Sequence, residues 1–347
     1  MKTLNDLDFN LKGKRILVRC DFNCPLNEKG EILDDFRIQA TLPTIKYLIK
    51  KKAKIILISH LGRPDGKVVE SLRLNPIQKR LEKYLKTSIR KTQNCLGEEV
   101  EKKISKMKES DIVLLENIQF YPGEKNNEEY FAESLSNYGE FFVMEAFGQA
   151  HRNYASIVGI TKYLPSVAGF LFEKEIKVLT KLRDNPLKPL IVIIGGAKVE
   201  DKARVISKFL VNSKFLLIGE LIEKEIKNKG LKFDFTQKIV APVDSVNTFD
   251  IGEKTIKIFK EKIFQAKTIF WSGPLGKIEE EKYQRGSKEI AKAIIKSGAF
   301  SVVGGGETVE FINQLGLTDK FNHVSTGGGA MLAFLSGEKL PGIEALK

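Results

Sequence analysis

Short apolar runs recur along the whole chain, and most of them are continuous rather than alternating with polar residues. They cover residues 15–21, 54–60, 111–117, 140–147, 190–196, 214–219, 238–244, 268–274 and 300–306. Amphipathic stretches lie between them, for example residues 37–51 and 285–298. Continuous apolar runs are typical of parallel strands that are covered on both faces. This alternation of strands and helices occurs in both halves of the chain. It therefore predicts an α/β fold with two doubly wound parallel-sheet domains.

The length of 347 residues also favours two domains rather than one core. The candidate boundary is the stretch 164–189, in which a turn is followed by a helical segment and then by a proline-rich exit. A helix at this place would connect the two domains.

The chain is basic, with a formal net charge of +13 at pH 7. Such a charge suits nucleic acid or small anionic substrates as partners. The lysines are spread along the whole chain and usually stand beside glutamates, as on solvated helix faces, so the charge alone gives little support to nucleic-acid binding. No apolar run reaches the ~18 residues of a membrane span, and the N-terminus has no signal-peptide core. We therefore expect a cytoplasmic protein without a membrane partner.

Polar side chains follow the predicted strands of the first half. They come directly after the strands or at the start of the next helix: Asp21, Asn23, Arg37, His60, Arg63, His151 and Arg152. Ligands of open α/β sheets bind beyond the carboxyl ends of the strands, so we expect these side chains to gather there. Arginine guanidinium groups make forked contacts with phosphate and carboxylate groups. This half therefore predicts a site for a small, highly anionic molecule.

The strand ends of the second half are rich in glycine instead. The stretches GGAKVEDK (195–202), VVGGGET (302–308) and VSTGGGAML (324–332) place glycines where a strand turns into a helix. Backbone N–H groups and the positive end of a helix dipole can meet phosphate at such places. The P-loop pattern, which ends in lysine followed by serine or threonine, is absent from 195–202. The second half therefore predicts a nucleotide site of another kind.

The segments at these strand ends resemble one family, phosphoglycerate kinase. Its motifs run in order through nearly the whole chain: RCDFNCPL, SHLGRP, LLEN, AFGQAHRNYAS, IGGAKVEDK, WSGPLG, GGGET and STGGGA. The resemblance implies two Rossmann-like domains joined by an interdomain helix, with the C-terminal segment returning to the N-terminal domain. Residues 1–168, completed by about 333–347, would bind phosphoglycerate, and residues 169–332, including the linker helix, would bind the nucleotide.

The resemblance also implies an enzyme, a phosphotransferase with a carboxyl group as acceptor. The reaction would be the reversible transfer between ATP and 3-phosphoglycerate that gives ADP and 1,3-bisphosphoglycerate, in glycolysis and gluconeogenesis. Mg²⁺ would accompany the nucleotide, and the protein would act as a monomer with no nucleic-acid partner.

Site residues follow from the resemblance position by position. Arg37 and Lys198 would contact the transferring phosphoryl group, and Gly328 would donate a backbone amide. These residues would hold phosphoglycerate: Asp21, Asn23, Arg37, His60, Arg63, Gln119 and Arg152. These would hold the nucleotide: Gly195, Gly196, Lys198, Lys202, Glu279, Gly305, Gly306, Glu307 and Thr308. Glu307 would also bind Mg²⁺.

Several positions depart from the family pattern. Gln119 stands where the family has a phosphate-binding arginine, Glu307 where it has the metal-binding aspartate, and Ser272 where it has asparagine. The segment around Gly219 is shortened, which affects part of the adenine pocket, and the chain is some tens of residues shorter than is usual for the family.

Three hypotheses remain open. The chain is an active phosphoglycerate kinase; or it is a weakened relative, a pseudoenzyme or a kinase of another phosphorylated carboxylic acid; or it is a basic nucleic-acid-binding protein on this scaffold. The retention of Arg37, Lys198 and Lys202 favours the first. The absence of a basic stripe interleaved with aromatic residues disfavours the third.

Overall fold

The computed structural model describes residues 1–6, 10–196 and 199–347, and these form two compact units. Unit 1 comprises Met1–Glu175 and Lys339–Lys347, and unit 2 comprises Ile176–Glu338. The division falls inside helix α6 (Phe170–Asp184), whereas the sequence suggested a division just before this helix.

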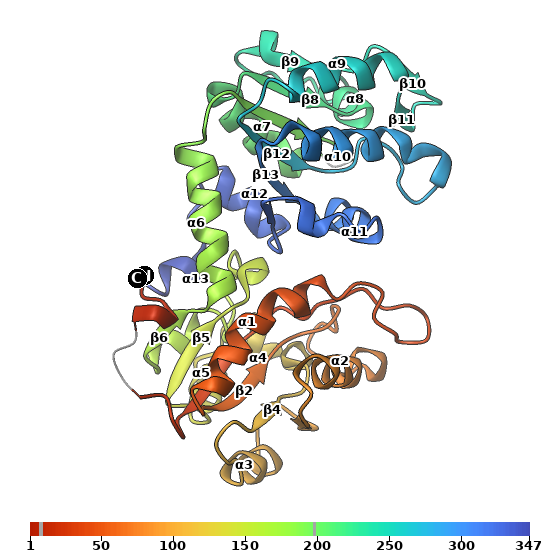
Figure 1. Ribbon diagram of the computed structural model, residues 1–347. Helices are drawn as coiled ribbons and strands as arrows, with labels where there is room; N and C mark the ends of the chain where they lie inside the picture. The colour runs from red at the N-terminus through yellow and green to blue at the C-terminus, as the bar shows by residue number, and fades with distance from the viewer. Residues whose placement is uncertain (7–9, 197–198) are drawn as a thin grey trace. The chain divides into compact units, whose positions relative to one another are not determined.

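Unit 1 contains a six-stranded sheet in the order β3-β4-β2-β1-β5-β6, and all of its strand pairs are parallel. Figure 1 labels β2, β4, β5 and β6 of this sheet. The strands are β1 (Arg15–Arg19), β2 (Lys54–Ile58), β3 (Arg90–Lys91), β4 (Ile112–Leu114), β5 (Phe141–Met144) and β6 (Ser166–Ala168). The doubly wound parallel sheet predicted for the first half is therefore confirmed. The edge strands β3 and β6 are short, and neither carries a continuous apolar run that the sequence pattern could reveal.

Helices surround this sheet, and their apolar faces complete its core. They are α1 (Phe36–Lys50), α2 (Asn75–Leu85), α3 (Glu98–Ser105), α4 (Pro122–Lys125), α5 (Glu129–Ser136), the first part of α6, and α13 (Pro341–Glu344). Ile45 and Leu48 of α1 belong to the same buried cluster as the inner residues of β1 and β2. The segment with α13 belongs to unit 1 because Gly342 N–H donates to the carbonyl of Ala150 over 2.8 Å.

The start of α6 is held by two side chains of unit 1. Glu145, which follows β5, accepts hydrogen bonds from the backbone N–H groups of Leu171 (3.1 Å) and Phe172 (3.3 Å). The hydroxyl of Thr44 accepts from Phe170 N–H over 3.0 Å. A Cβ atom at Gly169 would lie only 2.1 Å from Glu145 Oε2, so glycine is needed for this close approach. Free N–H groups at a helix start require such acceptors, and Glu145 and Thr44 supply them.

Unit 2 contains a second six-stranded parallel sheet, in the order β14-β13-β12-β7-β8-β9. Its strands are β7 (Leu190–Ile194), β8 (Phe215–Ile218), β9 (Ile239–Val240), β12 (Thr268–Ser272), β13 (Phe300–Gly304) and β14 (His323–Val324). All five residues of β7 are buried, as expected of an inner parallel strand rich in β-branched residues. The predicted run 238–244 forms only the two-residue β9, because Pro242 lacks the N–H group that a continuing strand would need.

The helices of unit 2 follow its strands, as the sequence pattern predicted. Besides the rest of α6, they are α7 (Glu200–Asn212), α8 (Glu220–Asn228), α9 (Glu253–Ile263), α10 (Arg285–Ser297), α11 (Gly306–Gln314) and α12 (Gly329–Leu335). A small antiparallel hairpin of β10 (Ser245–Val246) and β11 (Asp250–Ile251) stands outside the main sheet. Within the ranges that the structure describes, every helix is too short or too polar to cross a membrane.

Candidate functional site

Four loops of unit 1 meet at one edge of its sheet. They follow β1, β2, β4 and β5, which are neighbours in the strand order. Because the four strands are parallel, their carboxyl ends lie at the same edge, where open α/β sheets bind ligands. The loops carry most of the side chains that the sequence singled out in the first half.

Asp21 and Asn23 tie these loops together. Asp21 Oδ2 accepts from Arg37 Nη1 over 2.9 Å, and the Asp21 side chain is only 5% exposed. Asn23 Oδ1 accepts from the backbone N–H of Gly62 over 2.8 Å, which links the loop after β1 to the loop after β2. Burial raises the pKa of Asp21, but the positive charges around it, that of Arg37 first, and the hydrogen bond from Asn23 N–H together outweigh burial and hold that pKa below the usual value. The pair therefore places a fixed guanidinium group at the sheet edge.

His60 lies buried among these charges. Burial lowers the pKa of its imidazole to about 3, the positive charges of Arg19, Arg37 and Arg152 act in the same direction, and Asp21 opposes them. His60 is therefore neutral at physiological pH. Its Nδ1 is buried and has no hydrogen-bond partner among the described parts of the chain.

The other predicted substrate residues are less closely connected. Arg63 and Arg152 are exposed in the loops after β2 and β5. Gln119 is buried in the short 3₁₀ helix Ile118–Phe120, where its N–H donates to Asn117 Oδ1 over 3.1 Å. No hydrogen bond or ion pair between described residues connects Arg63 or the Gln119 side chain to Asp21 or Arg37. The structure thus joins Asp21 and Arg37 directly, and His60 lies buried where both charges act on it.

In unit 2 two glycine loops pass each other in close contact. Gly195 N–H donates to the Ser272 carbonyl over 2.9 Å, and Gly196 N–H donates to the Pro274 carbonyl over 2.7 Å. A Cβ atom at Gly195 would lie 2.0 Å from the Pro274 oxygen, and one at Gly273 would lie 2.1 Å from the Gly195 oxygen. Side chains are excluded at both positions because the backbone of the other loop fills the space, so glycine is needed there for the close approach of the two loops.

Lys202 and the start of α11 border these loops. Lys202 Nζ donates to the Gly195 carbonyl over 2.6 Å. Gly305 has a positive φ of 97° and precedes the first residue of α11, Gly306. Thr308 is fully buried, and its hydroxyl accepts from Gly273 N–H over 2.8 Å. The helix start, with its free N–H groups, therefore lies beside the glycine loops. Lys198, which the sequence predicted to belong here, is outside the described residues.

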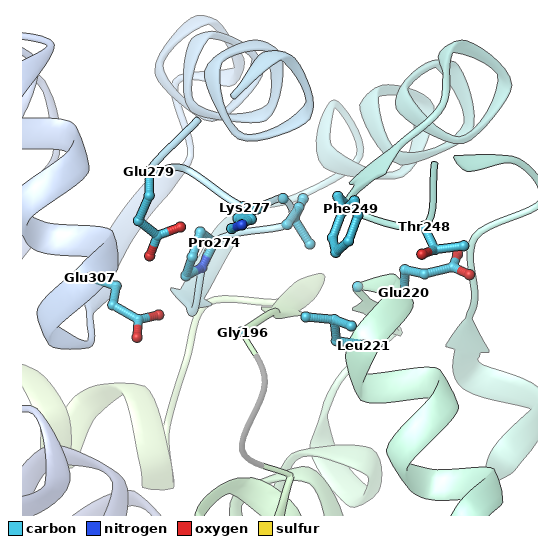
Figure 2. A pocket seen from close by; sticks show the side chains of 12 residues that line it. Gly196, Glu220, Leu221, Thr248, Phe249, Pro274, Lys277, Glu279 and Glu307 are labelled. Atoms are coloured by element: carbon cyan, nitrogen blue, oxygen red, sulfur yellow. The ribbon is translucent and has the colours of Figure 1, made fainter. Parts of the chain in front are cut away.

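A pocket of about 300 Å³ lies at this edge of unit 2. It is lined by Gly196, Gly219, Glu220, Leu221, Thr248, Phe249, Pro274, Leu275, Gly276, Lys277, Glu279 and Glu307. Figure 2 shows Glu279 and Glu307 on one side, Glu220 and Thr248 on the other, and Leu221 and Phe249 between them. The pocket thus includes three of the predicted nucleotide residues: Gly196, Glu279 and Glu307.

The apolar wall of this pocket was not predicted from the sequence. Phe249 is 44% exposed and Leu221 is 40% exposed, although both side chains are large and apolar. Phe249 lies at the tip of the β10–β11 hairpin, where Asn247 and Thr248 both have positive φ, of 52° and 66°. Such a conformation in a β-branched residue costs on the order of 1–3 kcal/mol and is often found at functional sites. Sequence patterns cannot distinguish an apolar pocket wall from core, although the aromatic residue directly before the DIG segment was a usable signal.

Gly328, the predicted catalytic amide donor, precedes α12. Its φ of 48° and ψ of −115° are accessible to glycine but not to residues with a side chain. No heavy atom among the described residues lies within 4 Å of the position that its Cβ would take. Its predicted role in catalysis stays a prediction.

Comparisons with known proteins agree on one family. The family model described as Phosphoglycerate kinase matches residues 4–234 and 221–338. The phosphoglycerate kinase of Dictyoglomus turgidum is 43% identical over 393 residues, covering 100% of this chain and 99% of the relative. That of Borreliella afzelii is 40% identical over 392 residues, with the same coverage of 100% and 99%.

Solved structures agree as well. The phosphoglycerate kinase from Pyrococcus horikoshii superposes with a TM-score of 0.89 at 32% identity, covering 100% of this chain and 98% of that chain. The one from Coxiella burnetii gives a TM-score of 0.81 at 31% identity, covering 99% and 98%.

Proposed function

We propose that this chain, which belongs to the phosphoglycerate kinase family, transfers a phosphoryl group reversibly between ATP and 3-phosphoglycerate, giving ADP and 1,3-bisphosphoglycerate. The observation that carries this proposal is the match over the full length of the chain, which includes the loops at both sheet edges. The relatives support this reaction over a kinase of another acid or a nucleic-acid-binding protein.

The loops of unit 1 would hold 3-phosphoglycerate. Arg37, fixed by Asp21, offers a guanidinium group that can contact a carboxylate or phosphoryl group through two N–H donors. His60 is neutral, so it can exchange a hydrogen bond with the substrate without adding charge. The exposed Arg63 and Arg152 would add positive charge, and Asn23 would keep the loops in place.

The pocket of unit 2 would hold the nucleotide. Leu221 and Phe249 present apolar surface on which a flat base can pack. Gly196 lines the pocket and Gly306 has open space at its Cβ position, so both can offer backbone surface to the phosphates, with Gly195 and Gly305 beside them. Lys202 supplies a positive charge nearby. Glu279, on the pocket wall, would contact the ribose.

Mg²⁺ fits the residues that are present. Magnesium prefers oxygen ligands and commonly takes one or two carboxylates together with nucleotide phosphates and waters. Glu307 offers a carboxylate on the pocket wall, and no group of three or more metal-binding side chains occurs among the residues with described positions. Glu307 would therefore hold Mg²⁺ only together with the nucleotide, and the ion would neutralise phosphate charge.

The chemistry requires positioning and charge neutralisation rather than a base. The acceptor is a carboxylate, already ionised at neutral pH, so no proton has to be removed from it. The main obstacle is repulsion between two anionic substrates, which cationic side chains and backbone amides reduce. Arg37 of unit 1 and Lys198 of unit 2 would both contact the transferring group, and Gly328 would donate an amide to it.

This proposal includes a cellular setting. The reaction belongs to glycolysis and gluconeogenesis, and we propose that the chain works in the cytoplasm as a monomer. Sedimentation of the purified protein would test the monomeric state.

A coupled assay of ATP-dependent 1,3-bisphosphoglycerate formation tests the function. The natural chain should turn over ATP only when 3-phosphoglycerate is present. Lys198→Ala should lower kcat much more than it raises either KM, because its charge acts mainly during transfer. Lys214→Ala, which removes a surface lysine bonded to Gln265, should change neither constant. If the natural chain shows no turnover, the proposal is wrong.

A further inference from the structure

The shortened segment after β8 places an acidic side chain in the wall of the nucleotide pocket. Glu220 is the first residue of α8 and follows Gly219 directly. Figure 2 shows its side chain extending toward Thr248, on the opposite side of the pocket from Glu279 and Glu307. Since the phosphates would lie near Glu307 and the glycine loops, Glu220 lies where the base would be.

The Glu220 carboxylate retains capacity to bind a ligand. Its side chain is 17% exposed, and Lys224 Nζ lies 3.3 Å from Oε1. No described residue donates a hydrogen bond to Oε2. The hydroxyl of Thr248 likewise makes no hydrogen bond within the described chain, and a hydroxyl can both donate and accept.

This combination of groups matches one base better than the other. A carboxylate only accepts hydrogen bonds. The Watson–Crick edge of guanine presents two adjacent donors, N1–H and the N2 amino group, beside the acceptor O6. The same edge of adenine presents one donor, the N6 amino group, beside the acceptor N1, which a carboxylate oxygen repels. Glu220 as acceptor and Thr248 as donor therefore complement guanine.

We propose that Glu220 is a specificity-determining residue that contacts the base edge and makes guanine nucleotides substrates at least as good as adenine nucleotides. The proposal rests on the proposed function, because it takes the unit 2 pocket to be the nucleotide site. Leu221 and Phe249 can pack against adenine and guanine equally well. The preference for one base therefore depends on the polar groups of Glu220 and Thr248.

Calorimetric titration with the Mg²⁺ complexes of ADP, GDP and IDP tests the proposal. The natural chain should bind GDP as tightly as ADP or more tightly. IDP, which lacks the N2 amino group, should bind about tenfold more weakly than GDP. Glu220→Gln should shift the ratio of GDP to ADP affinity by about tenfold toward ADP, because an amide pairs a donor and an acceptor as adenine does.

Glu223→Gln is the matched control. Glu223 lies in the same first turn of α8 and pairs with Lys227 over 2.6 Å, but it does not line the pocket. Its replacement should leave the GDP to ADP ratio unchanged. If Glu220 only stabilises the start of α8 and pairs with Lys224, Glu220→Gln would lower the affinities for GDP and ADP by the same factor. The ratio of the two affinities would then be unchanged, and this would overturn the proposal.

The comparison of GDP with IDP needs no variant, so it holds even if Glu220→Gln fails to fold. Equal affinity of the natural chain for GDP and IDP, or ADP binding tighter than GDP, would overturn the role of Glu220. ATP turnover with 3-phosphoglycerate in the same preparation would leave the proposed function standing in that case. Absence of both turnover and nucleotide binding would overturn both proposals.

Discussion

Arg37 Nη1 and Asp21 Oδ2 lie 2.9 Å apart, and they join the start of α1 to the loop after β1. The Asp21 carboxylate is 5% exposed and the Arg37 side chain 28%. The buried partner therefore fixes the direction of a guanidinium group that still reaches solvent. A group held in this way loses little freedom when an anionic substrate binds.

Arg37→Lys should lower kcat/KM for 3-phosphoglycerate by about tenfold or more, because an ammonium group cannot reproduce the two parallel contacts of a guanidinium group. The KM for the nucleotide should stay the same. Steady-state kinetics with each substrate varied in turn would measure this. Arg80→Lys is the control, since Arg80 also pairs with a carboxylate of unit 1, that of Asp35, but belongs to no predicted site. Equal effects of the two variants would contradict a special role for Arg37.

Gln119→Arg should tighten binding of 3-phosphoglycerate by about tenfold or more. A hydrogen bond to a charged group contributes ~1.5–3 kcal/mol, and glutamine offers only a neutral donor over a shorter reach. KM should fall with kcat nearly constant, because the contact persists from ground state to transition state. Calorimetry with 3-phosphoglycerate would measure the affinity, and Gln265→Arg, at an exposed position of unit 2, controls for the added charge. An unchanged or weaker affinity for 3-phosphoglycerate would mean that another cationic side chain already binds its phosphate group.

Glu307→Gln should raise the Mg²⁺ concentration that gives half-maximal activity, because it removes the carboxylate from the pocket wall. Glu307→Asp, which keeps the charge, should change this concentration only modestly. Mg²⁺ titrations of the coupled assay would compare the two. Glu310→Gln, on the same helix, should behave like the natural chain. If activity appears only in Glu307→Asp, the natural chain is a pseudoenzyme.

Glu145→Gln should make stability less dependent on pH. Burial raises the pKa of Glu145 from 4.5 to about 7, so its contribution to folding is complete below pH 4.5 and is lost as pH rises through 7. This loss amounts to at most about 1.4 kcal/mol per pH unit. Scanning calorimetry at pH 5 and pH 8 should therefore show a smaller difference in Tm for the variant than for the natural chain.

Glu109→Gln provides the comparison for Glu145→Gln, because Glu109 is 44% exposed and makes only a distant ion pair with Lys12. Its pH dependence should match that of the natural chain. A pH dependence that Glu145→Gln leaves intact would show that other groups cause it.

The sequence predicts a structural feature well where a single physical cause determines which residue types occur there. The apolar runs of β1 and β7 predict buried parallel strands because both faces of these strands are covered. The glycine of the loop after β7 has a packing reason that the sequence did not show, since Gly195 and Gly273 pass each other too closely for any side chain, and the nucleotide contact predicted for Gly195 stays a prediction.

Other features depend on neighbours far away in the chain. Leu221 and Phe249 line a pocket, yet their residue types are equally common in a core. The shifted pKa values of His60 and Glu145 arise from burial, which the linear sequence does not contain. The edge strand β3 is only Arg90–Lys91 and is defined by its pairing with β4 rather than by its residues.

The return of Lys339–Lys347 to unit 1 has a consequence for the order in which the molecule is made. On the ribosome, Ala150 emerges long before its hydrogen-bond partner Gly342, and all of unit 2 is translated between them. Unit 2 is continuous in the chain, so its last residue is synthesised before α13. Unit 1 begins first but gains α13 only afterwards, so the earlier half of the nascent chain is the later one to be completed.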